Sequence, residues 1–106
     1  MKKLPNLSKF DEICDNDTDF KNQMIDILKK EFPEEQNLFY ESFEAKKYKA
    51  AAEVVHKLKH KINLLDLEDG YLLAAKFEKQ LLSDSIELSD DFIDILTKIE
   101  QFLKKI

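Results

Sequence analysis

The chain is poor in residues that break helices. Its 106 residues include one glycine and two prolines, which leaves little material for the tight turns of β-hairpins. Hydrophobic residues make up 43% and charged residues 37% of the chain, a mixture that favours long helices. Because this length is typical of one compact unit, we expect a single all-α domain over residues 1–106.

Cysteine and long apolar runs are also scarce. Cys14 is the only cysteine, so no intramolecular disulfide can form, which fits a reducing compartment. No apolar run approaches the ~20 residues of a membrane span, and the N-terminus lacks the apolar region of a secretory signal. We therefore expect a cytoplasmic protein without a membrane partner. The short lead-in that begins at Met1 favours a free-standing protein.

Positively charged residues are also fewer than negatively charged ones. The chain has 17 Lys and Arg residues against 22 Asp and Glu residues, for a net charge of -5. Proteins that bind nucleic acid usually carry a basic excess or stripe, because they neutralise phosphates. The charge balance therefore argues against nucleic acid as a partner.

Apolar residues at helical spacing predict five helices. A short helix over 7–13 is followed by capping side chains at 15–19 and by a long helix from Asp19 to about Lys46. Pro33 interrupts this long pattern. Because proline removes a backbone donor and clashes with the preceding turn, we expect one helix kinked near Lys29–Phe32.

Three more helices complete the pattern. They are predicted from about Tyr48 to Leu65, from a capping segment at 66–69 to about Ser83, and from a capping segment at 89–91 to the end. The connections are short, so neighbouring helices should be antiparallel. We expect an up-down antiparallel four-helix bundle with a short N-terminal helix, and a monomer, since such a bundle buries its own core.

His56 is the most informative residue of the chain. At ~100° per residue it lies about 130° from the centre of the apolar stripe of its helix, so its ring should face solvent. Neutral imidazole is a good nucleophile near neutral pH and can capture a phosphoryl group. Lys59 lies one turn later and can reach the phosphoryl oxygens. Ala52, one turn earlier, is expected to leave free space above the ring.

Glu78 is unusual because it falls in the middle of the apolar stripe of the following helix. Since that helix should be antiparallel to the helix of His56, the carboxylate could accept the ring proton or pair with Lys59. A surface histidine, a solvated lysine and a carboxylate tied to a nearby lysine are also common without any function. Spacing alone therefore leaves the site open.

The string Val55-His56-Lys57-Leu58-Lys59 resembles the HxLK core of histidine-containing phosphotransfer (HPt) domains, which are phosphorelay intermediates. The resemblance extends to the acidic turn before Asp19-Phe20 and to the helix of residues 24–35 with its proline. Glu78 falls on the helix where the family commonly carries Gln or Glu near the active ring. The resemblance therefore covers most of the chain.

The resemblance implies that His56 is the phosphoryl acceptor, that Lys59 stabilises the phosphoryl group, and that Glu78 orients the imidazole or Lys59. It implies a phosphocarrier without autonomous catalytic activity and without a cofactor of its own. The implied partners are the receiver domains of response regulators, which hold Mg²⁺, and a hybrid sensor histidine kinase. We expect Lys57, Lys59 and Lys61 to meet the acidic receiver pocket, beside an exposed apolar patch.

The chain departs from the family pattern at two glycine positions. His60 stands directly after Lys59, where the family usually has glycine, and Leu65-Asp66 replace a second glycine at the helix end. A bulky ring at position 60 could obstruct docking or select a particular receiver. A degenerate module that docks receivers without phosphotransfer, a helical protein-interaction module, therefore stays open as an alternative.

A metal site is the other alternative. His56 and His60 are four residues apart, so they lie on one face of a helix and can share a metal ion, with Glu53 as a third ligand. The resulting Glu-x-x-His-x-x-x-His pattern differs from the His-Glu-x-x-His pattern of metalloproteases.

Overall fold

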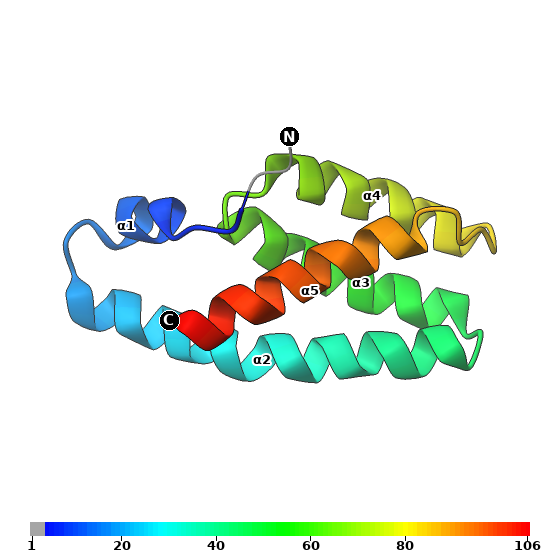
Figure 1. The fold of residues 1–106 in the computed structure, drawn as a ribbon, viewed down its shortest axis with the longest axis horizontal. Coiled ribbons are helices and arrows are strands. Elements are labelled where there is room, and N and C mark those ends of the chain that lie inside the picture. The colour runs from blue at the N-terminus through cyan, green and yellow to red at the C-terminus, as the bar shows by residue number, and fades with distance from the viewer. Residues whose placement is uncertain (1–3) are drawn as a thin grey trace.

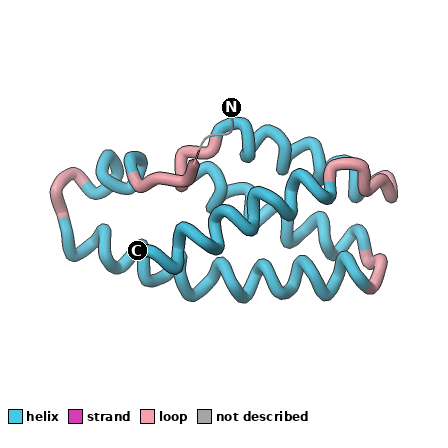
Figure 2. The backbone as a smooth tube through the Cα atoms, in the orientation of Figure 1, coloured by secondary structure: helices cyan, strands magenta, loops and turns pink. Residues whose placement is uncertain are grey.

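The computed structural model describes residues 4–106, which form five helices and no strand (Figure 1, Figure 2). The helices are α1 (Ser8–Cys14), α2 (Thr18–Glu44), α3 (Tyr48–Leu64), α4 (Glu68–Leu82) and α5 (Ser89–Lys105). The four long helices alternate in direction (Figure 1), which confirms the all-α, up-down antiparallel bundle. Within the described residues, no helix has both the length and the apolar character needed to span a bilayer. Met1, on which the free-standing interpretation rests, lies outside the described residues.

α2 is one continuous helix of 27 residues. Its N-cap is Asp17, whose side chain accepts a hydrogen bond from the backbone N–H of Phe20 at 3.0 Å. This contact satisfies one of the N–H groups that the first turn of a helix leaves free. The helix continues through Pro33 to Glu44, so the prediction of one helix rather than two is confirmed.

The side-chain caps predicted for the last two helices are wrong. Leu67 and Leu88 are the N-cap residues of α4 and α5, and neither forms a side-chain cap hydrogen bond. The acidic residues fall inside the first turns instead, at Glu68 and Asp69 in α4 and at 90–91 in α5. There their charge interacts favourably with the positive end of the helix dipole.

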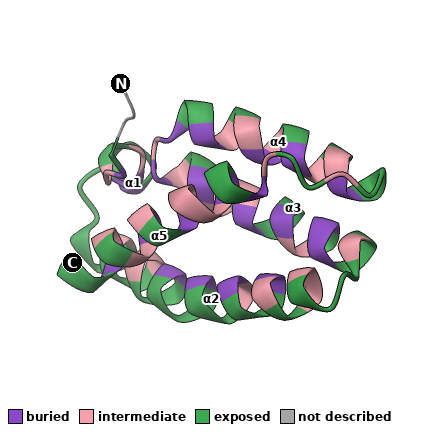
Figure 3. Ribbon diagram, turned by 45° about the vertical axis from the view of Figure 1, so that its right-hand side comes forward, coloured by how far each residue is buried: buried purple, intermediate pink, exposed green. Residues whose placement is uncertain are grey.

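An aromatic cluster packs the end of the bundle near the turn between α2 and α3. Phe39 of α2 contacts Phe77 of α4 and Phe92 of α5, with ring centroids 6.0 and 5.2 Å apart. All three side chains are fully buried, and burial of each contributes about 1.5–3 kcal/mol. Buried residues line the inward faces of the helices (Figure 3). Because Phe77 is fixed in this core, the rotation of α4 about its axis is fixed too.

Gly70 lets α4 approach α3 closely. A Cβ atom at this position would lie 3.1 Å from Cγ2 of Ile62 on α3, which is tighter than ordinary van der Waals contact. The single glycine of the chain is therefore placed where α4 lies against a side chain of α3. This close pairing of α3 and α4 brings the side chains of the candidate site together.

α1 covers the other end of the bundle, as predicted. Phe10 is buried in the core, and the backbone N–H of Asn6 donates to the carbonyl of Leu65 at 3.1 Å. The lead-in is thereby tied to the turn between α3 and α4. The other terminus lies beside α2, where the Lys29 ammonium donates to the carbonyl of Ile106 at 2.7 Å.

Candidate functional site

The ring of His56 projects from α3 into solvent, with 55% of the side chain exposed. Val55 is fully buried, and the next residue lies ~100° around the helix, so the core itself turns His56 outward. Ala52, one turn earlier, is buried. α3 packs against both α2 and α4, so its buried face is wider than one apolar stripe.

Glu78 of α4 contacts both His56 and Lys59 of α3. Nδ1 of His56 lies 3.1 Å from Oε2 of Glu78, and the Lys59 ammonium donates to Oε1 at 3.1 Å. The sequence suggested that this carboxylate meets either the ring or the lysine, and the structure shows both contacts at once. We call His56, Lys59 and Glu78 the α3–α4 site.

The contact with Glu78 defines the chemistry of the imidazole. An ionised carboxylate only accepts hydrogen bonds, so Nδ1 carries the ring proton in this contact. Nε2, on the far edge of the ring, then keeps its lone pair. A neutral imidazole with an exposed lone pair is a nucleophile, and the second nitrogen is held by a hydrogen-bond acceptor.

Tyr71 of α4 is a further member of this region, and the sequence analysis did not identify it. The Lys59 ammonium lies 5.8 Å from the centroid of its ring, within the range of a cation–π contact. Tyr71 precedes Glu78 by seven residues, or about two helical turns, so both face the same side of α4. This seven-residue spacing is visible in the sequence and could have placed Tyr71 beside Glu78. The Tyr71 ring therefore attracts the Lys59 ammonium weakly, in addition to the contact of that ammonium with Glu78.

His60 is exposed, and its ring stands perpendicular to that of His56, with centroids 5.1 Å apart. The bulky group at the usual glycine position therefore lies directly beside the candidate nucleophile. Among residues 4–106, no group of three or more His, Cys, Asp or Glu side chains is arranged to hold a metal ion. The prediction of Glu53 as a third ligand is therefore wrong.

Lys61 faces the groove between α2 and α3, whereas His56 contacts α4 across the groove between α3 and α4. Its ammonium pairs with Glu35 at 2.9 Å and with Glu31 at 3.2 Å, both on α2. Five residues separate it from His56, so it lies about 140° around the helix. The prediction that Lys61 joins the positive docking cluster is therefore wrong, whereas Lys57 is exposed.

We call Lys61, Glu31 and Glu35 the α2–α3 clamp. Burial opposes the charge of Lys61 and alone would lower its pKa. The hydrogen bonds to Glu35 and Glu31 and the attraction of the two carboxylates outweigh burial, so the pKa of Lys61 is raised above its ordinary value. The clamp therefore holds a firmly charged ammonium between α2 and α3.

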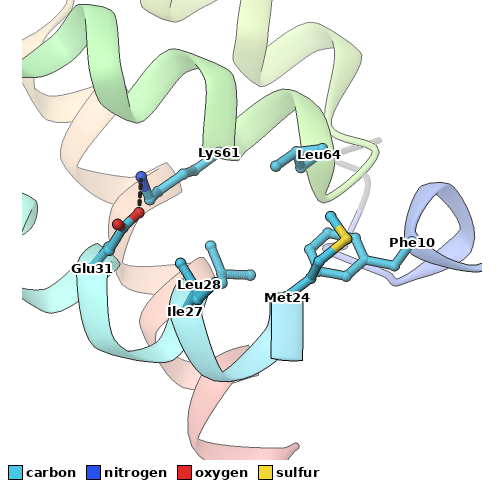
Figure 4. Close-up of a pocket in the computed structure, with 7 residues that line it drawn as sticks. All are labelled: Phe10, Met24, Ile27, Leu28, Glu31, Lys61 and Leu64. Atoms are coloured by element: carbon cyan, nitrogen blue, oxygen red, sulfur yellow. Dashed lines mark ion pairs between the residues drawn. The ribbon is translucent and has the colours of Figure 1, made fainter. Parts of the chain in front are cut away.

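An apolar pocket of about 220 Å³ opens beside the clamp, with Glu31 and Lys61 at its edge (Figure 4). Its other lining residues come from α1, α2 and α3: Phe10, Met24, Ile27, Leu28 and Leu64. The pocket therefore lies where α1 covers the bundle, and none of the residues of the α3–α4 site lines it.

Comparison with known proteins gives one match. The model of the Hpt domain family matches residues 23–105. No curated protein and no solved structure matches the chain. The matched region includes all three residues of the α3–α4 site.

Proposed function

Because this chain belongs to the Hpt domain family, we propose that it relays a phosphoryl group between receiver-domain aspartates through His56. Hpt domains are phosphocarrier modules of phosphorelays that interact with receiver domains and kinases, and they are not catalysts themselves. The observation that supports His56 most is the contact of one carboxylate with both its ring and Lys59. This contact engages Nδ1, so Nε2 is the ring nitrogen left without a contact to Glu78, and the same carboxylate holds the Lys59 ammonium.

The transfer step follows from the chemistry of these groups. A phosphorylated aspartate of a receiver domain is an acyl phosphate. Nε2 of His56 attacks phosphorus, the N–P bond forms, and the bond from phosphorus to the aspartyl oxygen breaks, so the carboxylate leaves with the electron pair. The imidazole then carries a positive charge, and its Nδ1 proton is held by Glu78 at 3.1 Å. Transfer to a second receiver reverses these steps.

Lys59 supplies positive charge beside the transferred group. An ammonium has three N–H donors, and one of them is used by Glu78. The others are free to approach phosphoryl oxygens, where a fixed cation stabilises the developing negative charge. Mg²⁺ of the receiver supplies the remaining charge, so the carrier needs no metal for transfer.

The partners in this proposal are receiver domains of response regulators and a hybrid sensor histidine kinase. Exposed Lys57 carries positive charge next to His56 and suits an acidic receiver pocket. We further propose that the chain acts as a monomeric cytoplasmic carrier. The single cysteine fits a reducing compartment.

The test is phosphoryl transfer from a receiver charged with acetyl phosphate. We expect a label on the carrier that is stable in base and labile in acid, and that is lost in His56→Gln with unchanged helicity. His60→Gln, the same change one turn away, should still accept label. A label retained by His56→Gln would contradict the proposal, and so would a folded carrier that accepts nothing from several receivers.

A further inference from the structure

The two histidines of this chain lie one turn apart on the exposed face of α3. Their rings are perpendicular, with centroids 5.1 Å apart, and both residues are exposed. Imidazole is the commonest metal ligand in proteins, and histidines at i and i+4 of a helix can bind one ion. The pair therefore has the ligand type and the helical spacing of a two-histidine metal site.

The separation of the rings also suits one ion. Zn²⁺ binds histidine nitrogen at about 2.0–2.1 Å in tetrahedral geometry, which puts two ligating ring centroids roughly 5 Å apart. The observed 5.1 Å matches this separation. The spacing of the two rings is therefore compatible with one ion bound between them.

The contact of His56 with Glu78 is a second, independent observation. A histidine that binds a metal commonly donates its other ring N–H to a carboxylate, which fixes the ring and makes the ligating nitrogen more basic. Nδ1 of His56 already lies 3.1 Å from Oε2 of Glu78, so Nε2 is the nitrogen left for an ion. The same nitrogen is the proposed nucleophile.

We propose that a divalent transition metal ion such as Zn²⁺ binds His56 and His60 together and thereby blocks phosphoryl acceptance. Coordination uses the Nε2 lone pair that must attack phosphorus, so an ion and a phosphoryl group exclude one another. The blocking effect rests on the proposed function, whereas metal binding itself does not. A glycine at position 60 would leave one imidazole and no chelate, so this sensitivity depends on the departure from the family pattern.

The site is open and reversible. Within residues 4–106 no third His, Cys, Asp or Glu completes a closed site, so water fills the other coordination positions. Structural zinc sites use four protein ligands, and two imidazoles give weaker binding. The ion therefore acts as an exchangeable inhibitor rather than a resident cofactor.

Binding is tested first, without any receiver. Metal-free protein is titrated calorimetrically with ZnCl₂. We expect one ion per chain, binding at least tenfold weaker in both His60→Gln and His56→Gln, and unchanged binding in Glu53→Gln. Equal zinc binding by wild type and His60→Gln would overturn the site, as would no binding at millimolar zinc.

Inhibition is tested with one phosphorylated receiver at constant Mg²⁺ and rising zinc. At zinc tenfold above its dissociation constant, about a tenth of the carrier is free, so wild-type transfer should fall about tenfold. His60→Gln, which binds zinc at least tenfold more weakly, should keep at least half of its own metal-free rate under the same conditions. Equal loss in both proteins would place the effect on the receiver and overturn the inhibition.

The two experiments also separate this inference from the proposed function. Zinc binding that needs both histidines, in a protein that accepts no label from any receiver, would support the metal site and contradict phosphotransfer. Normal transfer that zinc never affects in wild type would support phosphotransfer and contradict the metal switch.

Discussion

Two lysines on α3 that lie two residues apart face opposite grooves and differ in their partners. Lys59 and Lys61 are similarly buried, with 13% and 15% of their side chains exposed. Lys59 meets one carboxylate, that of Glu78, which also contacts His56. Lys61 meets two carboxylates on α2. The two ammonium groups therefore differ in the amount of negative charge around them.

This difference separates a candidate binding site from a structural clamp. In the α3–α4 site one carboxylate serves two donors, so an incoming phosphoryl group can supply the missing negative charge. In the α2–α3 clamp negative charge is already in excess. There Oε1 of Glu35 is buried and has no hydrogen-bond partner among the described residues. An anion would be repelled from the clamp and attracted to the site.

In this comparison, the largest expected effect comes from replacing each lysine with methionine. Methionine keeps much of the length of the lysine side chain and removes its charge. Lys59→Met should lower the rate of phosphoryl transfer roughly 10–100-fold, because one cation that stabilises the developing charge is lost. Lys61→Met, the matched control, should keep a rate within about twofold. Rates are measured from one charged receiver, and equal losses in both variants would break the distinction between the grooves.

Glu78→Gln should have the next largest effect. The amide oxygen still accepts from Nδ1 of His56, but the negative charge that favours the imidazolium form is gone, so transfer should slow about tenfold. Glu35→Gln makes the same change in the clamp and should leave transfer unchanged. Single-turnover rates with a charged receiver test this pair, and a normal rate for Glu78→Gln would remove Glu78 from the proposed mechanism.

The fold was predictable because its signals are local. Apolar residues at helical spacing gave the helices, and the acidic cap at Asp17 and the short connections gave their starts and directions. The capping segments before α4 and α5 were mispredicted. Both contain acidic residues, but the helices begin at Glu68 and Ser89, after a leucine N-cap.

The site was only partly predictable because it depends on how α2 and α4 pack against α3. The HxLK pattern and the odd position of Glu78 led to the carboxylate contact across α3 and α4. The packing of Ala52 and the direction of Lys61 could not be derived from one helix, because α3 has neighbours on two sides. A single apolar stripe identifies one buried face of α3. The second buried face is known only when the positions of both α2 and α4 are known.

The clamp should contribute to stability rather than to transfer. Lys61→Met leaves Glu31 and Glu35 close together without their shared cation, which should lower the free energy of unfolding by about 1–3 kcal/mol. Urea unfolding followed by circular dichroism measures this change. Lys59→Met should cost less, because Glu78 keeps its contact with His56, and a larger loss in Lys59→Met than in Lys61→Met would contradict the assignment.

The smallest effect, and the one most specific to the clamp, is its dependence on alkaline pH. The pKa of Lys61 is raised above the ordinary 10.5, so its charged form is favoured in the folded state. Its contribution to stability is therefore fully present below about pH 10.5 and is lost as the pH rises through the pKa of Lys61 in the folded state.

The difference in unfolding free energy between wild type and Lys61→Met should stay constant from about pH 7 to pH 9.5 and shrink above that range. Both proteins share every other ionisable group, so the subtraction removes the effect of those groups. A difference that stays constant or grows to about pH 11.5 would show that packing of the side chain, rather than its charge, joins α2 to α3.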